Sequence, residues 1–583
     1  MSKLDLRRSL YPYWNVKFLV SNALIPIIAL AAYFGSFALI STKWLMEGIN
    51  YIFTYRTFQY LSILLLVLSL IVIFLKVLKK DAARAYQPSI EKMQPSDAVL
   101  LLLPLTPVVQ YVLNNQVNLS FFDALLTIFF FIVFSSVYLF VIPWVLRKVG
   151  STRILQALGL SFVYTILSMA SLSQQFAWLT YGSLKIQLPY FGVAFLLLWV
   201  LLDPRNRKIL ILTVSVYFVI NSSMQFISNG SQVEQPSVSD VEKRLSAMIA
   251  NRSPVYAPNI YLLVYDSYVP NETMLAYGID NSAQETYLTE QGFVLYPHIY
   301  SVGATSVDTM GRIFDISKKL PSPYRKSVSG DGPVQHVLKD LGYKTYGILP
   351  TDYMFRGIGS SYDVSVPQSA FPQFMYLINA VLIGEFKFDL EFSDLTPDEF
   401  NRIKKSLIEE MSGNKAFLYT HLNLPNHSQN SGTCLPNETE LFKGRLLQAN
   451  QKMQEDVQNI LSADPEALII VAGDHGPSLT KTCTRTDKAY DLSEITRLDI
   501  QDRYGTFLAI RWPSIDYQDY DEIMVIQDLF PAIFGYLYQD ASLLDLRIDP
   551  STKERNITSG AFVENGIIVG GINDGEPLYL SDR

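Results

Sequence analysis

Apolar residues are distributed unevenly along the chain. Long, nearly uninterrupted apolar runs crowd its first part, whereas short apolar runs alternate with amphipathic patterns from residue 258 onward. An apolar run of roughly twenty residues can cross a bilayer as a helix, and short strands alternating with amphipathic helices are typical of an α/β fold. The pattern predicts a membrane domain over residues 1–227, a polar linker over 228–257 and a globular domain over 258–583.

Seven apolar runs of the first part are candidate membrane helices. They cover residues 18–41, 58–75, 98–113, 124–146, 154–172, 187–202 and 209–227. The runs 98–113 and 187–202 are short, and the first contains Pro104 and Pro107, which also fits a re-entrant segment. Omitting both short runs would leave five membrane spans.

The charges of the connecting loops favour seven spans. Cations gather in alternate loops, which hold Lys76, Lys79, Lys80, Arg84 and Lys92, then Arg147, Lys148 and Arg153, then Arg205, Arg207 and Lys208. The loops between them hold only Lys43, Arg56 and Lys185. Because cations mark cytoplasmic loops, we expect a multi-pass protein of the cytoplasmic membrane with an internal amino terminus and the globular domain outside. No small-residue cleavage site follows the first run, so we expect that run to be an anchor.

Apolar runs of the globular part predict the strands of a largely parallel sheet. The clearest are NIYLLVYD at 259–266, KAFLYTHL at 415–422 and LIIVA at 468–472. Helical patterns lie between them, including a long one over 440–464 just before the last of these strands. This alternation is that of an α/β domain. The run GIIVGGI at 566–572 is expected to form an edge hairpin.

Composition narrows the partners and the compartment. The net charge is −7, so no basic surface points to nucleic acid. The chain has two cysteines, Cys434 and Cys483, and each follows a predicted strand end on one edge of the sheet. Thiols outside the cytoplasm tend to pair, so we predict a Cys434–Cys483 disulfide, although two free thiols stay compatible with the sequence.

The strand at 468–472 runs into the motif VAGDHGP, residues 471–477. Asp474 and His475 therefore follow the carboxyl end of a strand, where α/β sheets bind ligands. An adjacent carboxylate and imidazole can bind one divalent metal ion. Gly476 permits a sharp turn, and Pro477 prevents a return to strand. The motif by itself also allows a simple turn with a capping Asp and a surface His.

Two earlier features strengthen the metal interpretation. Asp266 ends the strand at 259–266, and SVGATSVDTMGRIFD at 301–315 carries two hydroxyls, Thr305 and Ser306, behind a glycine and an alanine. A strand-end Asp, a hydroxyl after a small-residue turn and a late Asp-His-Gly resemble the alkaline phosphatase and sulfatase superfamily over roughly residues 256–540. The closer likeness is to its membrane-anchored branch, which holds lipoteichoic-acid synthases, phosphoethanolamine transferases and sulfatase-like proteins.

The resemblance implies one divalent ion, Mn²⁺, Mg²⁺ or Zn²⁺, held by Asp266, Thr305, Asp474 and His475. Two-zinc members of the superfamily need a further histidine after the Asp-His-Gly motif, and no histidine follows His475 here. A hydroxyl attacks phosphorus well only when a metal ion holds it as an alkoxide. The run GATS matches the Gly-x-Thr-Ser of polymer synthases, which makes Thr305 the predicted nucleophile and Ser306 the alternative. Thr305 is also a candidate helix N-cap.

A second segment, HLNLPNH, ends the strand at 415–422. In the family a similar segment supplies a histidine that contacts the phosphoryl or leaving group, and either His421 or His427 could take that role here. Arg312 could bind phosphate but is expected to form a salt bridge. Neither candidate hydroxyl is followed by the Pro and Arg that mark a formylglycine precursor, which disfavours sulfate-ester hydrolysis.

The resemblance implies transfer of a phosphoglycerol or phosphoethanolamine type of head group. The donor would be a phospholipid, the acceptor an envelope glycan or lipid, and the intermediate a phospho-threonine at Thr305. Two alternatives stay open: a phosphate- or sulfate-ester hydrolase that uses water as acceptor, and a catalytically inactive sulfatase-like sensor or scaffold of the envelope. The complete set of predicted ligands argues against the inactive protein.

Overall fold

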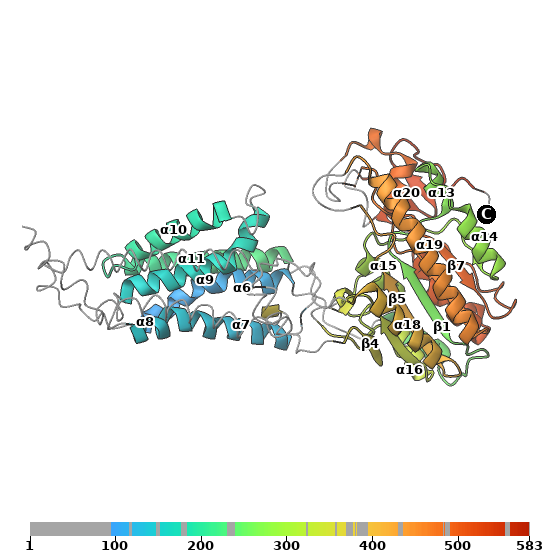
Figure 1. Cartoon of the computed structure of the whole chain (residues 1–583), viewed down its shortest axis with the longest axis horizontal. Helices are drawn as coiled ribbons and strands as arrows, with labels where there is room; N and C mark the ends of the chain where they lie inside the picture. Colours follow the sequence, from blue (N-terminus) through green and yellow to red (C-terminus); the bar gives the residue numbers. More distant parts are fainter. Residues whose placement is uncertain are drawn as a thin grey trace, which may run out of the picture. The chain divides into compact units, whose positions relative to one another are not determined.

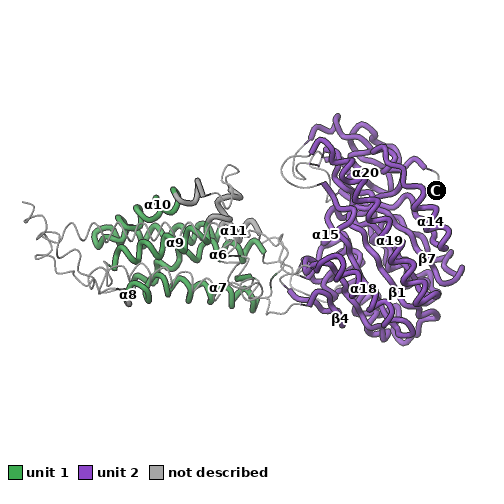
Figure 2. Tube along the Cα trace, in the orientation of Figure 1, with its two compact units in different colours: residues 1–233, 371–390 green, residues 234–370, 391–583 purple. Residues whose placement is uncertain are grey.

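The chain divides into two compact units in the computed structural model (Figures 1 and 2). The helical unit comprises residues 1–233 and 371–390, and the α/β unit comprises 234–370 and 391–583. The structure describes residues 95–115, 119, 121–146, 152–175, 184–229, 240–321, 324–355, 358–368, 377–378, 381, 395–428, 435–481, 483, 490–553 and 560–581. The predicted spans 18–41 and 58–75 lie outside the described residues.

Helices occupy each of the five predicted spans that fall within the described residues. The elements are η2 (Pro95–Leu101), α6 (Leu102–Asn114), α7 (Phe121–Ser136), η4 (Val137–Val141), α8 (Ile142–Leu146), α9 (Thr152–Gln175), α10 (Leu184–Leu201) and α11 (Arg207–Asn229). Pro107 lies inside the continuous helix α6. In this part of the chain, Ser96–Asn114 and Phe121–Trp144 are long and apolar enough to cross a membrane, and Pro189–Leu201 is a shorter apolar helix. The seven-span count stays a prediction.

The helical unit has many apolar side chains on its surface and contains two ion pairs, one of them buried. Large exposed apolar side chains lie on three helices, among them Phe121, Phe122 and Phe129 of α7, Leu196 and Leu197 of α10, and Leu212 and Val219 of α11. Asp97 is fully buried and forms an ion pair with Arg207, while Arg153 pairs with Asp203 at 2.7 Å. These pairs join segments next to the three loops in which cations gather.

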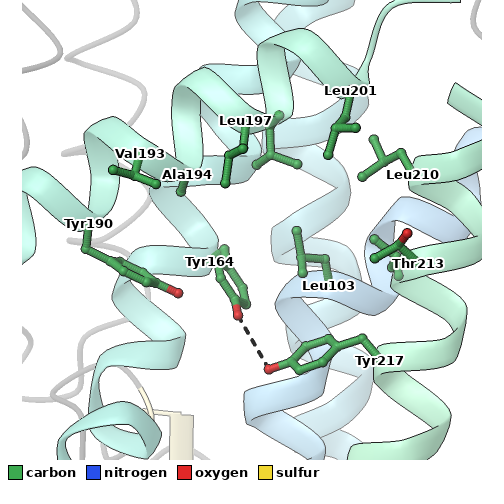
Figure 3. Close-up of a pocket in the computed structure, with 12 residues that line it drawn as sticks. Leu103, Tyr164, Tyr190, Val193, Ala194, Leu197, Leu201, Leu210, Thr213 and Tyr217 are labelled. Atoms are coloured by element: carbon green, nitrogen blue, oxygen red, sulfur yellow. Dashed lines mark hydrogen bonds between the residues drawn. The ribbon is translucent and has the colours of Figure 1, made fainter. Parts of the chain in front are cut away.

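A cavity of about 270 Å³ opens between α6, α9, α10 and α11 (Figure 3). Its lining is mainly leucine and valine, with the hydroxyls of Tyr164, Tyr190 and Tyr217 as its main polar groups. The hydroxyls of Tyr164 and Tyr217 lie 3.4 Å apart. The helices of this unit therefore do not fill all the space between them with side chains.

The α/β unit is built on a seven-stranded sheet in the order β2-β7-β6-β1-β5-β3-β4. The strands are β1 (Ile260–Tyr265), β2 (Val294–Leu295), β3 (Lys344–Ile348), β4 (Val364–Val366), β5 (Ala416–Leu422), β6 (Leu468–Ala472) and β7 (Leu508–Arg511). The pairs from β6 through β1, β5 and β3 to β4 are parallel, which confirms the predicted, largely parallel sheet. The strand β7 is antiparallel to both β6 and β2.

Helices cover both faces of this sheet (Figure 1). Their bounds are α12 (Asp240–Ile249), α13 (Asn271–Ala276), α14 (Ser282–Glu290), α15 (Ser306–Asp315), α16 (Pro333–Asp340), α18 (Pro397–Met411), α19 (Glu438–Ala463), α20 (Arg497–Tyr504) and α21 (Leu529–Tyr538). Short turns of helix are η6 (Tyr353–Phe355), η7 (Leu492–Glu494), η8 (Ile526–Asp528) and η9 (Ala541–Leu546). Alternate residues of β1 enter separate cores, with α15, α16 and α21 on one face and α18 and α19 on the other. This two-sided burial explains the uninterrupted apolar runs of the central strands.

The run 566–572 supplies one strand of a hairpin rather than both, and that hairpin is not an edge of the main sheet. Strands β8 (Phe562–Glu564) and β9 (Ile567–Val569) pair antiparallel as a separate two-stranded sheet. The polar linker predicted over 228–257 contains the end of α11 and the whole of α12, whose Leu245 is buried in the core of the α/β unit. An amphipathic helix therefore leads into this unit.

Candidate active site

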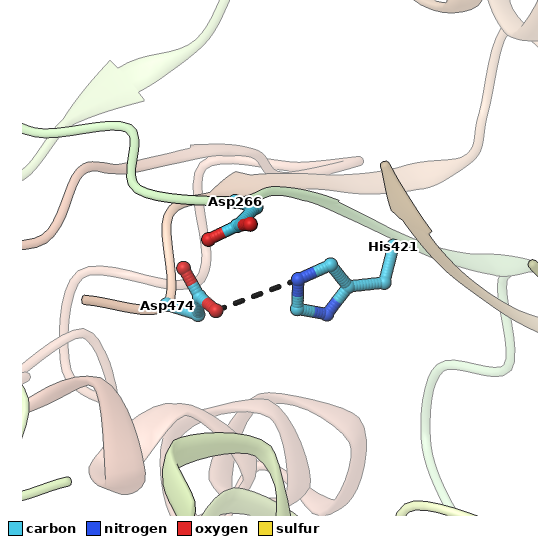
Figure 4. Close-up of side chains that lie close together, drawn as sticks. All are labelled: Asp266, His421 and Asp474. Atoms are coloured by element: carbon cyan, nitrogen blue, oxygen red, sulfur yellow. Dashed lines mark ion pairs between the residues drawn. The ribbon is translucent and has the colours of Figure 1, made fainter. Parts of the chain in front are cut away.

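Three neighbouring strands bring Asp266, His421 and Asp474 together at one edge of the sheet (Figure 4). Val264 of β1 is in register with His421 of β5 on one side and with Ala472 of β6 on the other. Asp266 and Asp474 each lie two residues beyond this pair, so they are level with each other at the ends of β1 and β6. Parallel pairing makes the carboxyl ends coincide, which is why residues far apart in sequence converge here.

The two glycines of the Asp-His-Gly motif are required by close backbone contacts. A Cβ atom at Gly473 would lie 2.0 Å from the carbonyl oxygen of Tyr268, and one at Gly476 would lie 2.0 Å from that of Asp502. No side chain fits at either position without moving the neighbouring backbone. The glycines thus let Asp474 and His475 turn inward between two packed segments.

The acids and imidazoles form one buried cluster. The Oδ2 atom of Asp474 lies 3.4 Å from the Nε2 atoms of both His475 and His421, and Oδ1 of Asp266 lies 3.5 Å from Nε2 of His475. The exposed fractions are 0% for Asp474, 2% for His421, 5% for His475 and 6% for Asp266. One ligand atom from each of Asp266, His421 and Asp474 lies within 4.8 Å of the others. Four of the predicted site residues therefore meet.

The hydrogen bonds of the histidines orient their Nε2 atoms. In His475, Nδ1 lies 2.8 Å from the carbonyl oxygen of Gly476, and because a carbonyl can only accept, Nδ1 carries the proton. In His421, Nδ1 lies 3.0 Å from the hydroxyl of Tyr419. With its proton on Nδ1, the neutral form of His475 keeps a lone pair on Nε2, which can bind a metal ion.

The pKa values of the two buried carboxyls are shifted in opposite directions. Burial, followed by the nearby charge of Asp474, raises the pKa of the Asp266 carboxyl. Burial would also raise the pKa of Asp474, but His475, His421 and the N–H of Ser267 outweigh it and bring that pKa well below its usual range. Among the described residues, the ion-pair partners of these two carboxylates are imidazoles. Two buried acids thus share a site in which one titrates high and the other low.

The donor set fits a divalent cation. Donor atoms about 2.1 Å from a tetrahedral ion stand about 3.4 Å from one another, and three donor pairs here are 3.4 or 3.5 Å apart, while the donor atoms of Asp266, His421 and Asp474 all lie within 4.8 Å of one another. In the described part of the chain, Nε2 of His421 and Oδ2 of Asp474 are buried without a hydrogen-bond partner. Two carboxylates and two imidazoles suit Zn²⁺ or Mn²⁺, and their oxygens also suit Mg²⁺.

The two candidate hydroxyls have different surroundings. Thr305 is exposed at the N-cap position of α15, and its Oγ1 lies 3.3 Å from the hydroxyl of Tyr324. Ser306 is half-buried, and its Oγ lies 3.5 Å from Nε2 of His475. The side chain of Thr305 forms no capping hydrogen bond with the helix. Of the two hydroxyls, that of Ser306 contacts the histidine of the metal motif, and the role of Thr305 as ligand stays a prediction.

The structure places His421 and His427 at different depths. His421 is buried 3.4 Å from Asp474, whereas His427 is half-buried, with its ring centroid 6.1 Å from that of His475. Arg445 of α19 holds the loop of His427 by donating to the carbonyl oxygen of Pro425 at 2.6 Å and to that of His427 at 3.4 Å. His421 is therefore a further potential ligand, and His427 is the histidine on the rim.

Ser267, Tyr324 and Arg445 contact the predicted site residues, and sequence reasoning missed them. Ser267 directly follows Asp266, so its adjacency was a usable signal, but no pattern marks Tyr324 or Arg445. Arg312 forms the expected salt bridge, with Nε 2.6 Å from Oδ1 of Asp308. Its guanidinium group is buried in that pair on α15.

The cysteine prediction agrees with the described residues. Cys483 is disulfide-bonded, and no cysteine in the described part of the chain is free. The chain has one other cysteine, Cys434, which lies outside the described residues. A disulfide suits a domain outside the cytoplasm.

No protein-family model matches the chain, and no curated protein matches it. Several solved structures are similar. Lipooligosaccharide phosphoethanolamine transferase A from Neisseria meningitidis, an integral membrane protein, is 12% identical over 90% of this chain and 98% of its own, with a TM-score of 0.34.

Two further structures match the chain over about half its length. The C-terminal periplasmic domain of EcEptC from Escherichia coli, in complex with Zn, is 11% identical over 49% of this chain and 83% of its own, with a TM-score of 0.32. An alkaline phosphatase superfamily protein from Vibrio parahaemolyticus is 14% identical over 52% of this chain and 76% of its own, with a TM-score of 0.32. These neighbours include the groups that the sequence motifs resemble, but similarities this low do not establish the activity of this chain.

Proposed function

We propose that this chain is a metal-dependent enzyme that transfers a phosphorus-linked head group from a phospholipid to an envelope glycan or lipid. The observation that carries the proposal is the pocket in which Asp266, Asp474, His475 and His421 converge beside a helix that begins with two hydroxyls. Perturbed, buried titratable groups at the carboxyl edge of a sheet are typical of catalysis. The head group is of the phosphoglycerol or phosphoethanolamine type.

The residues divide into those that hold a metal ion and those that react. Asp266, Asp474 and His475 would hold the ion, with His421 as a further donor. The bound ion would supply charge neutralisation for the phosphoryl group and acidify the attacking hydroxyl. A membrane protein that takes its donor from the bilayer also needs an apolar surface, and the exposed side chains of α7, α10 and α11 supply one.

The reaction proceeds in two displacements at phosphorus. The hydroxyl of Thr305 forms a bond to phosphorus while the bond to the diacylglycerol oxygen breaks, and the threonine proton passes to the basic groups of the pocket. His427, at the rim, donates a proton to the departing diacylglycerol. The acceptor hydroxyl then gives its proton to His427 and attacks phosphorus, while the bond from phosphorus to the Thr305 oxygen breaks and that oxygen takes back its proton from the basic groups of the site. Ser306 is the alternative nucleophile, supported by its contact with His475.

The proposal is tested with the full-length protein in mixed micelles. Labelled phosphatidylglycerol and phosphatidylethanolamine are supplied with Mn²⁺, Mg²⁺ or Zn²⁺, and diacylglycerol is measured. We expect metal-dependent release of diacylglycerol and a phosphorylated peptide that contains residues 305 and 306. Release of the free head group without any acceptor would identify a hydrolase. A metal-loaded protein that releases no diacylglycerol from either lipid would contradict the proposal.

A further inference from the structure

Ser267 lies between the two carboxylates of the candidate metal site. It is fully buried and follows Asp266 directly. Its backbone has a φ of 65°, in the left-handed region that residues other than glycine, asparagine and aspartate rarely adopt. Such backbone geometry persists only where the surroundings enforce it, and it clusters at functional sites.

Two hydrogen bonds connect Ser267 to both acids. Its backbone N–H donates to Oδ1 of Asp474 at 2.8 Å, and its hydroxyl donates to Oδ1 of Asp266 at 2.9 Å. The N–H of His475 also donates to Oδ1 of Asp474, at 2.9 Å. One oxygen of Asp474 is therefore occupied by two backbone donors.

This arrangement leaves the other oxygen of Asp474 facing the imidazoles. Its Oδ2 is fully buried, has no hydrogen-bond partner among the described residues, and lies 3.4 Å from Nε2 of both His421 and His475. Nε2 of His421 is likewise buried without a hydrogen-bond partner. Unpartnered buried atoms aimed at one point are what a bound cation would satisfy.

We infer that Ser267 is a positioning residue for the divalent cation. It fixes the rotation of Asp266 through its hydroxyl and that of Asp474 through its N–H, so that each carboxylate presents a preset oxygen to the ion. The inference rests on the proposed function only for the presence of a metal ion. Hydrogen bonds to metal ligands typically contribute about 10- to 100-fold to metal affinity.

The test compares two substitutions of Ser267 with a matched control. Ser267→Gly removes the hydroxyl but accepts the left-handed backbone, whereas Ser267→Ala removes the hydroxyl and keeps the strain. Ser478→Gly is the control, since Ser478 also has a positive φ, of 55°, follows the same motif and donates its N–H to the carbonyl oxygen of Asp502. The Mn²⁺ and Zn²⁺ dissociation constants of each full-length variant are measured by chelator competition, and the metal-free melting temperature is recorded.

We expect Ser267→Gly to weaken metal binding about tenfold without lowering the metal-free melting temperature. Ser267→Ala should weaken binding equally and lower that temperature, and Ser478→Gly should leave affinity unchanged. Wild-type affinity in both Ser267 variants, or a wild-type protein that binds neither ion, would overturn the inference. The metal-binding measurement uses no lipid substrate, so it is independent of the proposed reaction. If the Ser267 variants lose metal affinity as expected but the wild-type protein releases no diacylglycerol, only the proposed function is contradicted.

Discussion

Buried carboxylates occur in both units of the chain, but their partners differ. In the helical unit, fully buried Asp97 forms an ion pair with Arg207. At the carboxyl edge of the α/β sheet, Asp266 and Asp474 lie together with imidazoles as their ion-pair partners. Folding neutralises Asp97 with an arginine, whereas it places Asp266 and Asp474 close to each other's negative charge. Two buried carboxylates this close are stable only when a proton or a cation lies between them. The second arrangement is the one that we propose as the active site.

The α/β unit also contains a buried carboxylate that is paired with a basic side chain, so both arrangements occur in this unit. On the face of the sheet covered by α18 and α19, Nζ of Lys404 lies 2.7 Å from Oδ2 of Asp456, and the hydroxyl of Tyr265 donates to the same oxygen at 2.8 Å. Tyr265 and Asp266 are consecutive. Adjacent residues at the end of one strand therefore serve a structural ion pair and the candidate metal site.

The largest expected effect is the loss of a ligand from the site. Asp474→Asn or His475→Ala should remove bound metal and reduce diacylglycerol release by several orders of magnitude, because each removes a side chain that would bind the metal ion directly. Asp266→Asn should behave in the same way. Metal content by elemental analysis and turnover are measured on the same samples. Full metal content in Asp474→Asn would contradict the distinction between an acid that pairs with a basic side chain and one that binds a metal ion.

The next effect separates the two hydroxyls. Thr305→Ala should abolish turnover while the fold stays intact, Thr305→Ser should retain some activity, and Ser306→Ala should have a mild effect on turnover. The readout is diacylglycerol release, with circular dichroism as the control for folding. An active Thr305→Ala beside an inactive Ser306→Ala would move the nucleophile by one residue, and two active variants would exclude a covalent intermediate at this position.

A stability effect without a catalytic one is expected at the structural pair. Lys404→Met leaves Asp456 buried without its cation, which typically costs about 3–5 kcal/mol. The free energy of unfolding should fall by this amount, while metal content stays at the wild-type level. The double substitution Lys404→Met with Asp456→Leu should recover part of the loss. If Lys404→Met released the metal instead, the structural pair and the site would be coupled.

The smallest effect is a change in pH dependence. Burial raises the pKa of Asp315 to about 6, despite a hydrogen bond from Ser327 at 2.6 Å. The folded state then holds a proton that the unfolded state has lost, so Asp315 lowers stability as pH rises from about 4 to 6 and keeps it lowered above that range. Relative to wild type, Asp315→Asn should gain about 2–3 kcal/mol more free energy of unfolding at pH 7.5 than at pH 4. Thermal unfolding at both pH values measures this, and equal shifts at both would contradict it.

Much of the α/β fold could be predicted because its central strands are buried on both faces. Such strands appear as short apolar runs, and the acids that end them mark the edge of the sheet where ligands bind. The strands β2 and β4 were missed, since they have two and three residues and carry no pattern of their own. The place of the carboxyl-terminal hairpin depended on tertiary packing rather than on local sequence.

The site was predictable residue by residue only where a motif spans neighbouring positions. Asp474 and His475 come from one turn, and Asp266 ends a recognisable strand. The sequence could not choose between His421 and His427, because the choice depends on the register of β5 against β1. It also could not show that Ser306 contacts His475 while Thr305 contacts Tyr324. The directions of these two side chains depend on the residue at which helix α15 begins.

The strand order also governs how the protein is made. The central strand β1 emerges first from the ribosome, but its two neighbours come from residues 416–422 and 468–472, and Ser267 meets Asp474 across 207 residues. Both edges of an apolar strand thus stay unpaired while the chain is elongated at about 5–20 residues per second. Long-range parallel pairing is slow and exposes the chain to aggregation. A nascent chain that ends before Asp474 would carry this open strand without the residues of the candidate metal site.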